Sequence, residues 1–401
     1  MSISKVKAIA VVLTMAAAVF AQENARMRSM GFAPMSDISD VFTYPVLMMG
    51  YPNQVQATFN DGAVIGIKQI GEGFSIGVLA NQGLMCPGFA DAAITHLNAL
   101  PGGPVGGRQF NENFNIPHLL LGFGAGPLNL GLDIFVEYAS YNANTVDLAG
   151  NDNISKAHIL NPGARVSAGL EFGDMELLAK FGMGFPSYGG EYRLGATTTK
   201  IDPNSKGLYM ETGAELSLPI ADLDFTAGFG YGFENFNTHN NSTGPHEWHS
   251  IITVYLGAEF NVLETAAAAL GYTFFRFAET DIMDFPSGNP VSTTKAMDGI
   301  HAHVFNLGME NIWDNAWIFD AFALRAGALY ALGLPVVRNT SDGDLRSKIK
   351  FPGTHSGVNP TMGFGVSYSF LTLDLALDMG DWSSGVFAGP AAGLVTGTIK
   401  F

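Results

Sequence analysis

The last nine residues of the chain alternate between apolar and polar side chains and end on an aromatic residue. The apolar face holds Val395, Ile399 and Phe401, and the polar face holds Thr396, Thr398 and Lys400. Successive side chains of a β-strand point to opposite faces, and a transmembrane β-barrel needs one face for lipid and one for the lumen. This ending predicts an outer-membrane barrel, with Phe401 as the signal that the barrel-assembly machinery reads.

The start of the chain has the features of an export signal. Lys5 and Lys7 precede an apolar run over residues 8–20, and Ala21 follows that run. This order predicts a secretory signal peptide over residues 1–21, cleaved after Ala21. The run of about 14 residues is shorter than the roughly 20 that a membrane-spanning helix needs. We expect the mature protein in the outer membrane of a Gram-negative cell, in contact with its lipid.

Composition favours short strands after the signal peptide. Charged residues make up 14% of the chain and hydrophobic residues 47%, with 49 glycines, and the hydrophobic residues are dispersed along it. The single cysteine, Cys86, excludes an intrachain disulfide and is predicted to be a free thiol in a surface loop. The formal net charge of -16 argues against nucleic acid as a partner, because phosphate binding needs clustered Lys and Arg.

Several segments alternate in steps of two, with one apolar face each. The clearest cover residues 128–138, 164–172, 175–181, 223–233, 248–262 and 371–379. Strands of about 10 to 13 residues suit a bilayer crossing, whereas a soluble β-sandwich, which also alternates, uses strands of about five or six. Counting back from the C-terminus gives about sixteen strands, or about fourteen without the short first hairpin of Gln54–Phe59 and Ala63–Ile70.

The predicted connections alternate between short and long. Tight turns are expected near residues 71, 126, 173, 221, 263, 313 and 370, and long loops over 81–115, 140–160, 184–206, 237–247, 278–299, 336–357 and 380–390. Outer-membrane barrels have short periplasmic turns and longer external loops. The fold class we predict is all-β: a transmembrane antiparallel up-and-down β-barrel of about 14 to 16 strands over residues 54–401. A short N-terminal periplasmic or plug segment over residues 22–53 precedes it.

Two sets of residues are assigned from this pattern. The first is an aromatic belt at the lipid–water interface, predicted because its members lie near strand ends: Trp248, Trp313, Trp317 and Trp382. The second lines the lumen: Asp133, Glu137, Arg165, Glu171, Lys180, Glu211, Glu215, Glu259, Arg325, Asp374 and Asp378. Excess lumen carboxylates would favour cations and neutral solutes in an open pore. Alternatively, the charges pair across the interior and hold it shut.

Catalytic and metal chemistry have weak signals. His239, His246 and His249 gather near one predicted loop, and His301 and His303 share one face of a strand. No third ligand of the right type accompanies either group, so we expect no metal and no other cofactor. The Gly-x-Ser-x-Gly sequence of a nucleophile elbow is absent. We therefore expect a protein that is not an enzyme.

The segment before the first strand does not alternate and carries Asp37, Asp40 and Pro45. It resembles the family of fatty-acid and hydrocarbon outer-membrane transporters, whose N-terminal part often has a glycine-containing stretch, an acidic pair and then Asn-Pro-Ala. Here Tyr44 stands in place of the Asn and Val46 in place of the Ala. The resemblance implies a plug in the periplasmic mouth of the barrel. It also implies that a hydrophobic ligand crosses through an opening in the wall.

The function we expect is passage of small, hydrophobic molecules across the outer membrane. Such a transporter predicts an apolar pocket beneath the loops, and loop 81–115 contains Leu84, Met85, Phe89, Leu97 and Leu100. A general aqueous porin with an acidic, cation-preferring lumen is the first alternative. A structural or adhesive surface barrel is the second.

Overall fold

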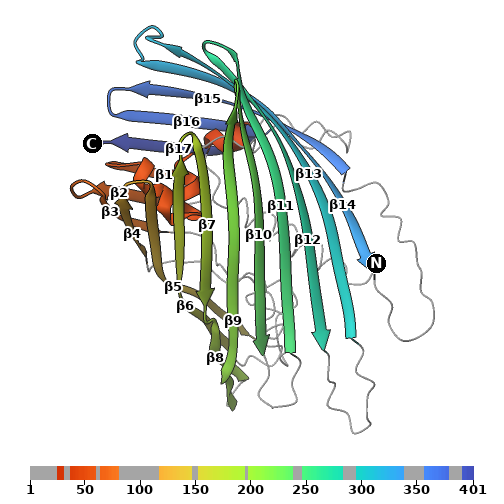
Figure 1. Ribbon diagram of the computed structural model, residues 1–401. Helices are drawn as coiled ribbons and strands as arrows, with labels where there is room; N and C mark the ends of the chain where they lie inside the picture. The colour runs from red at the N-terminus through yellow and green to blue at the C-terminus, as the bar shows by residue number, and fades with distance from the viewer. Residues whose placement is uncertain are drawn as a thin grey trace.

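The computed structural model describes residues 25–30, 37–59, 64–80, 117–146, 152–194, 197–237, 246–282, 295–337, 356–378 and 391–401. These residues form a barrel of antiparallel strands that surrounds a short helical segment near one end (Figure 1). The helical elements are α2 (Ala25–Ser29) and the 3-10 helices η1 (Ile38–Phe42) and η2 (Pro45–Gly50).

The strands follow one another around the barrel in chain order. They are β1 (Gln54–Phe59), β2 (Val64–Gln69), β3 (Phe74–Ala80), β4 (His118–Ala125), β5 (Leu128–Val146), β6 (Asp152–Phe172), β7 (Met175–Gly184), β8 (Ser187–Leu194), β9 (Thr197–Ile220), β10 (Leu223–Asn237), β11 (His246–Leu263), β12 (Ala266–Ile282), β13 (Lys295–Asp314), β14 (Ala321–Val337), β15 (Ser356–Tyr368), β16 (Leu371–Asp378) and β17 (Ala391–Lys400).

The barrel is closed by the first and last strands. β1 pairs with β2 on one side and with β17 on the other, where Gln54 lies opposite Lys400 and Phe59 opposite Val395. The backbone amide of Phe401 donates a hydrogen bond to the carbonyl oxygen of Asn53 over 2.9 Å. Each described strand is thereby paired on both sides, as a barrel in lipid requires.

Strands β7 and β8 occupy a single place in the wall. Both pair with β6 and with β9, and the register against β6 is the same on either side of the interruption. The interruption is Phe185–Pro186, beside Pro162 of β6. Proline has no amide hydrogen for the ladder. The strands therefore form a 16-strand barrel, which confirms the predicted fold class. The β1–β2 hairpin, which the sequence analysis could include or leave out of the strand count, is part of this barrel.

Two predicted loops were wrong. Residues 140–160 and 184–206 were expected to be long external loops, but most of them belong to strands β5, β6, β8 and β9. β9 is 24 residues long, well beyond the predicted length. Backbone pairing does not need apolar side chains, so polar sequence beyond the membrane band continues the ladder. Figure 1 shows these extensions beyond the end of the barrel opposite the tight turns.

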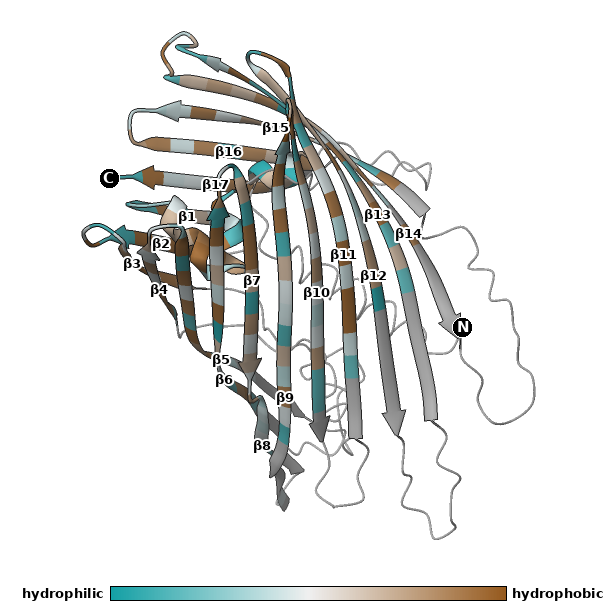
Figure 2. Ribbon diagram, in the orientation of Figure 1, coloured by the Kyte–Doolittle hydropathy of each residue, from teal (hydrophilic) through white to brown (hydrophobic). Residues whose placement is uncertain are grey.

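The outer face of the wall is apolar and exposed, as one-sided alternation predicts. On β13 the side chains of Phe305, Leu307 and Met309 are 47%, 46% and 47% exposed. On the opposite face of the same strand, Val304 and Glu310 are both 4% exposed. Figure 2 shows apolar and polar residues alternating along the strands. An exposed apolar wall of this kind is the lipid-facing surface of a transmembrane barrel.

The predicted interface tryptophans have different outcomes. Trp313 lies near the end of β13 with its ring stacked on Phe322 at 5.9 Å between centroids, and Trp317 is 91% exposed in the turn after β13. Trp248 belongs to β11, but its side chain is outside the described part of the structure. Trp382, Cys86 and the signal peptide over 1–21 also lie outside the described residues. Within the described ranges, no helix is long and apolar enough to cross a membrane.

Candidate functional site

The helical segment lies inside the barrel near the end that carries the tight turns, where it contacts two parts of the wall (Figure 1). α2 packs against β14–β17, and η2 packs against β3–β6. We call residues 25–30 and 37–51 the plug. Where the mature N-terminus begins, and the boundary between 22–53 and 54–401, stay predictions.

The first contact between plug and wall is made of ion pairs. The Arg26 guanidinium donates from Nε to Glu310 Oε2 over 3.1 Å and from Nη2 to Oε1 over 3.0 Å. Arg325 pairs with the same Glu310 over 2.5 Å and with Asp374 over 2.6 Å. We call these four residues the ionic attachment. Burial alone would lower the pKa of Arg26, but the hydrogen bonds and charges of Glu310, with the charge of Asp37, raise it above its ordinary value.

Two hydrogen bonds supplement the ionic attachment. The amide of Ala25 donates to Thr396 Oγ1 over 2.8 Å, and the hydroxyl of Thr361 donates to the Ser29 carbonyl over 3.1 Å. Beside them, a Cβ added at Gly363 would lie only 2.5 Å from Ser29 Cβ. The absence of a side chain at this glycine lets α2 approach the backbone of β15 closely.

The predicted acidic pair of the plug closes the N-terminus of η1. Asp37 Oδ1 accepts a hydrogen bond from the Ser39 amide over 3.0 Å, and Asp40 Oδ2 accepts one from the Asp37 amide over 2.8 Å. This reciprocal arrangement is a capping box. Arg26 lies 3.4 Å from the second Asp37 oxygen. Burial, followed by the charges of Asp37 and Glu215, raises the pKa of Asp40 to about 8.

The second contact between plug and wall is apolar. Four plug side chains meet four inward side chains of β2, β3 and β4, and all eight are at most 4% exposed. These residues, which we call the apolar attachment, are Ile38, Val41, Phe42 and Met48 with Ile65, Ile67, Leu79 and Leu120. The inner face of the barrel is thus hydrophobic beneath η1 and η2. Sequence reasoning missed it, since β2 and β3 carry apolar side chains on both faces.

Glycines on β4 and β5 bring η2 against the wall. A Cβ at Gly122 would lie 2.7 Å from Met49 Sδ, and a Cβ at Gly131 would overlap the backbone of Pro45 and Val46. The Val46 amide donates to Ser167 Oγ over 2.8 Å. Pro45 is the first residue of η2, a position that suits its fixed φ and missing amide hydrogen. Thus Pro45, predicted as part of the N-terminal motif, lies directly on the wall.

Five predicted lumen residues come together on β5, β6, β7 and β9. Arg165 lies 2.5 Å from Glu211 and 3.7 Å from Asp133, and Lys180 lies 3.0 Å from Glu211. Arg165 also donates to the Phe42 carbonyl of the plug. Glu137 accepts a hydrogen bond from Asn161 over 2.7 Å. Opposite charges therefore alternate across this part of the wall and reach the plug.

The remaining predicted lumen residues are dispersed. Arg325 and Asp374 belong to the ionic attachment, and Glu215 accepts a hydrogen bond from the Tyr255 hydroxyl. Glu259 is half-buried on the inward row of β11, Glu171 is exposed at the mouth, and the Asp378 side chain lies outside the described part. Sequence reasoning missed Glu310, although it shares the inward row of Val304 on β13, and counting in twos along that strand would have found it.

His118 is a second lumen residue that the sequence reading missed. Its Nδ1 lies 3.1 Å from Asp133 Oδ1, its ring stacks on Phe135 with centroids 5.0 Å apart, and the side chain is buried. Of the predicted histidine groups, His239 and the side chain of His246 lie outside the described part of the structure. His249 is inward and 3.8 Å from Glu234, whereas His301 and His303 lie on the outward row. Among the described residues, no group of three His, Cys, Asp or Glu has the geometry to hold a metal.

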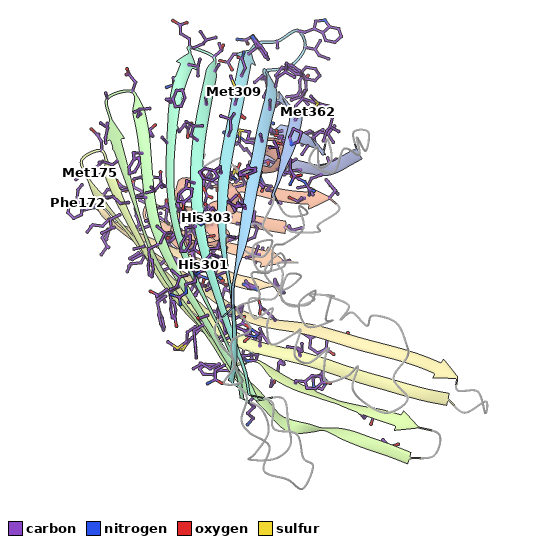
Figure 3. All side chains as sticks on the ribbon, turned by 90° about the vertical axis from the view of Figure 1, so that its right-hand side faces the viewer. Phe172, Met175, His301, His303, Met309 and Met362 are labelled. Atoms are coloured by element: carbon purple, nitrogen blue, oxygen red, sulfur yellow. The ribbon has the colours of Figure 1, made fainter. Side chains whose placement is uncertain are left out.

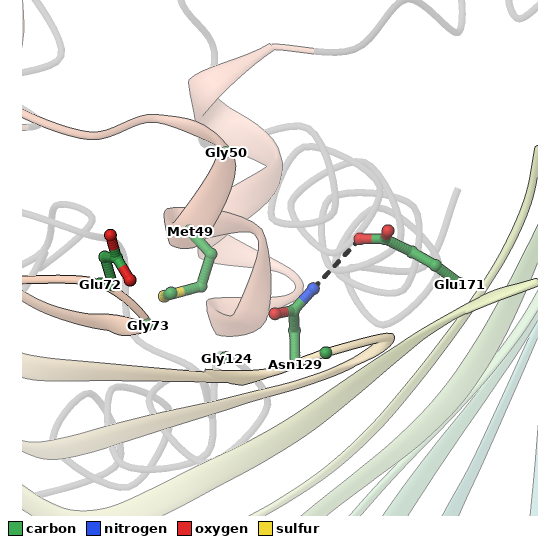
Figure 4. A pocket seen from close by; sticks show the side chains of 8 residues that line it. Met49, Gly50, Glu72, Gly73, Gly124, Asn129 and Glu171 are labelled. Carbon is green, nitrogen blue, oxygen red and sulfur yellow. Dashed lines mark hydrogen bonds between the residues drawn. The ribbon is translucent and has the colours of Figure 1, made fainter.

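A cavity of about 490 Å³ opens at the mouth of the barrel beside the end of η2 (Figure 4). Its lining comprises Met49, Gly50, Glu72, Gly73, Gly124, Gly126, Asn129 and Glu171. The Asn129 amide donates to Glu171 Oε1 over 3.2 Å. This cavity is polar on the wall side. The apolar pocket predicted beneath loop 81–115 lies outside the described residues.

No protein-family model matches the sequence, and the search of curated proteins found no match. Among solved structures, the chain is similar to the toluene transporter TodX of Pseudomonas putida, with a TM-score of 0.42 and 11% identity over 94% of this chain and 98% of that one. It is similar to the toluene transporter TbuX of Ralstonia pickettii, with a TM-score of 0.41, 11% identity and the same two coverages. It is also similar to a FadL homologue of Pseudomonas aeruginosa, with a TM-score of 0.41, 13% identity and again 94% and 98% covered.

Proposed function

We propose that this protein lets small hydrophobic molecules cross the outer membrane of a Gram-negative cell through a barrel whose periplasmic mouth is held shut by the plug. The observation that carries the proposal is the attachment of the plug to two parts of the wall, one by ion pairs and one by apolar packing. A barrel of 14 to 18 strands is wide enough for an aqueous channel unless something fills it. A porin that is continuously open does not need a segment that blocks its lumen.

The apolar surface of the inner wall beneath the plug favours a hydrophobic molecule as the cargo. Ile65, Ile67, Leu79 and Leu120 form an apolar surface on the inner wall, where a porin would have charged or polar side chains. Displacement of η1 and η2 would uncover that surface. An apolar solute gains free energy by leaving water for it, at about 25 cal/mol for each Å² buried.

The wall between β6 and β9 is the place where a cargo molecule could leave sideways. At the interruption between β7 and β8, Pro162 and Pro186 leave two neighbouring positions of the ladder without an amide hydrogen. The Phe185 amide still donates to the Pro162 carbonyl over 2.9 Å, so the two strands stay joined there. The proposed route through the wall therefore needs local separation of strands that have fewer hydrogen bonds than their neighbours.

The test combines electrical and uptake measurements on the refolded mature chain. In a planar bilayer we expect no steady conductance from the intact protein, and steady steps from a variant that lacks residues 22–51. In cells without other outer-membrane transporters, the intact protein should speed uptake of a radiolabelled monoaromatic hydrocarbon but not of a sugar of similar size. Steady cation-selective conductance from the intact protein would contradict the proposal and favour a porin. Absence of both conductance and uptake would favour a structural or adhesive barrel.

A further inference from the structure

One group of outward side chains differs from the rest of the apolar wall. It comprises Tyr272, Phe274 and Arg276 on β12, with His301, His303 and Phe305 on β13, and we call it the aromatic-basic patch. The register places the two rows face to face: Tyr272 opposite Phe305, Phe274 opposite His303 and Arg276 opposite His301. Six side chains of two neighbouring strands thus form one continuous surface.

The patch belongs to the outside of the barrel. Phe305, on the same row as His301 and His303, is 47% exposed, and Arg276 is exposed as well. On the alternate row, Phe275 and Val304 are 3% and 4% exposed. Figure 3 shows Met309, His303 and His301 following one another along the wall. A charged guanidinium therefore faces the surroundings of the barrel rather than its lumen.

The side chains of the patch hold one another in place. The Tyr272 hydroxyl lies 2.9 Å from His303 Nδ1, and the Phe274 ring lies 5.3 Å from the His303 ring and 5.6 Å from the His301 ring, measured between centroids. The ring centroids of Tyr272 and Phe305 are 5.1 Å apart. Aromatic pairs at such distances stabilise each other. Among the side chains that the structure describes, no carboxylate forms an ion pair with Arg276.

The height of the patch in the membrane follows from strand geometry. Strands that rise about 3.3 Å per residue and tilt by about 40° climb roughly 2.5 Å per residue along the membrane normal. Ten residues separate His303 from Trp313 on β13, so the two lie roughly 25 Å apart in height, which is about the height of the apolar band of such barrels. Trp313 marks the edge nearest the tight turns. His303 marks the opposite edge, and Arg276 with His301 lies just outside it.

We infer that the aromatic-basic patch is a binding site for a phosphate group of the glycolipid in the outer leaflet. The inference rests on the barrel lying in an outer membrane with its tight turns in the periplasm, as proposed above. Arg276 supplies a permanent cation whose planar donors match phosphate, and the imidazoles of His301 and His303 supply further donors. The aromatic rings sit at the boundary between acyl chains and headgroups. Charge complementarity selects an anionic lipid, because the surrounding outward residues are apolar.

The test is a binding titration with the full mature chain refolded in detergent. The probes are lipid A carrying its phosphates and the same lipid after enzymatic removal of the phosphates, with inorganic phosphate alone as a third probe. We expect tight binding of the phosphorylated lipid, with about tenfold weaker binding for Arg276→Gln, the loss of one charge-assisted hydrogen bond. Additional replacement of His301 and His303 by Gln should weaken it further. Arg276→Lys should keep part of the affinity.

The matched control is Lys68→Gln. Lys68 is an exposed, outward cation at the tight-turn end, with Nζ 5.1 Å from the centre of the Phe401 ring. Its replacement should leave lipid binding unchanged. Equal affinity for the two lipids, an unaffected Arg276→Gln variant or an equal loss with Lys68→Gln would overturn the inference, as would displacement of the lipid by inorganic phosphate at equal concentration. Folding of each variant is checked by its heat-modifiable migration on a gel. Conductance and uptake should be unchanged in Arg276→Gln, which separates this test from that of the transport function.

Discussion

The ionic attachment and the apolar attachment fasten the same plug by different physics. Arg26, Glu310, Arg325 and Asp374 are charged groups whose burial costs free energy that only their mutual pairing offsets. Phe42 and its neighbours on η1, η2 and β2–β4 gain free energy from burial itself. The ionic attachment therefore fails when one member is lost or changes charge, whereas the apolar attachment weakens gradually. Release of the plug from the wall is therefore best controlled through the ionic attachment.

The largest effect is expected from Arg325→Gln. This change leaves Asp374 buried without its ion-pair partner and leaves Glu310 with Arg26 as its remaining cation. Removing one member of a buried ion pair costs about 3 to 5 kcal/mol. The urea midpoint of the barrel in detergent should fall accordingly, and steady conductance should appear. Arg276→Gln, a change of the same type at an exposed outward site, is the control and should alter neither measurement. Equal stability of the two variants would show that the ion pairs of Arg325 do not stabilise the barrel.

A steric change tests the other side of the plug. Gly131→Ala places a Cβ against the backbone of Pro45 and Val46, which cannot move as a side-chain end could. Such overpacking costs about 1 to 3 kcal/mol. Conductance openings should become frequent while the barrel itself stays folded. Gly66→Ala is the matched control, because its Cβ would lie 3.5 Å from Val55 Cγ2, an ordinary contact. Similar conductance traces for the two variants would argue that η2 is not seated on β5.

The cap of η1 links the two attachments and gives a smaller effect. Asp37→Ala removes both the acceptor for the Ser39 amide and the partner of Arg26, whereas Asp37→Asn keeps the acceptor. Loss of an N-cap costs about 0.5 to 2 kcal/mol. Protection of the plug amides against hydrogen exchange should drop in Asp37→Ala and largely remain in Asp37→Asn. If both variants lose the same protection, the ion pair with Arg26 matters and the cap does not.

The wall could be predicted from sequence to a greater extent than the plug. Alternation such as that over 128–138 reports directly which side chains face lipid, because a strand has a period of two and the lipid face must be apolar. Strand ends were harder to predict, since Val146 and Asp152 are flanked by polar residues and yet pair in the ladder of β5 and β6. Plug contacts carry no local signal at all. Arg26 and Glu310 are 284 positions apart, and only closure of the barrel brings them together.

A change of pH tests the docking of the plug without replacing a side chain. The pKa of Asp40 is raised to about 8 in the docked plug from an ordinary value of 3.8, chiefly by burial. The docked state therefore binds the proton more tightly than the released state, and docking loses stability as pH rises between about 4 and about 8. Conductance openings should become more frequent over that range in the intact protein. Asp40→Asn keeps an oxygen acceptor for the Asp37 amide and carries no charge, so its openings should not respond to pH there. A pH response that persists in Asp40→Asn would assign the sensitivity to other groups and leave the ionic attachment as the sole point of electrostatic control.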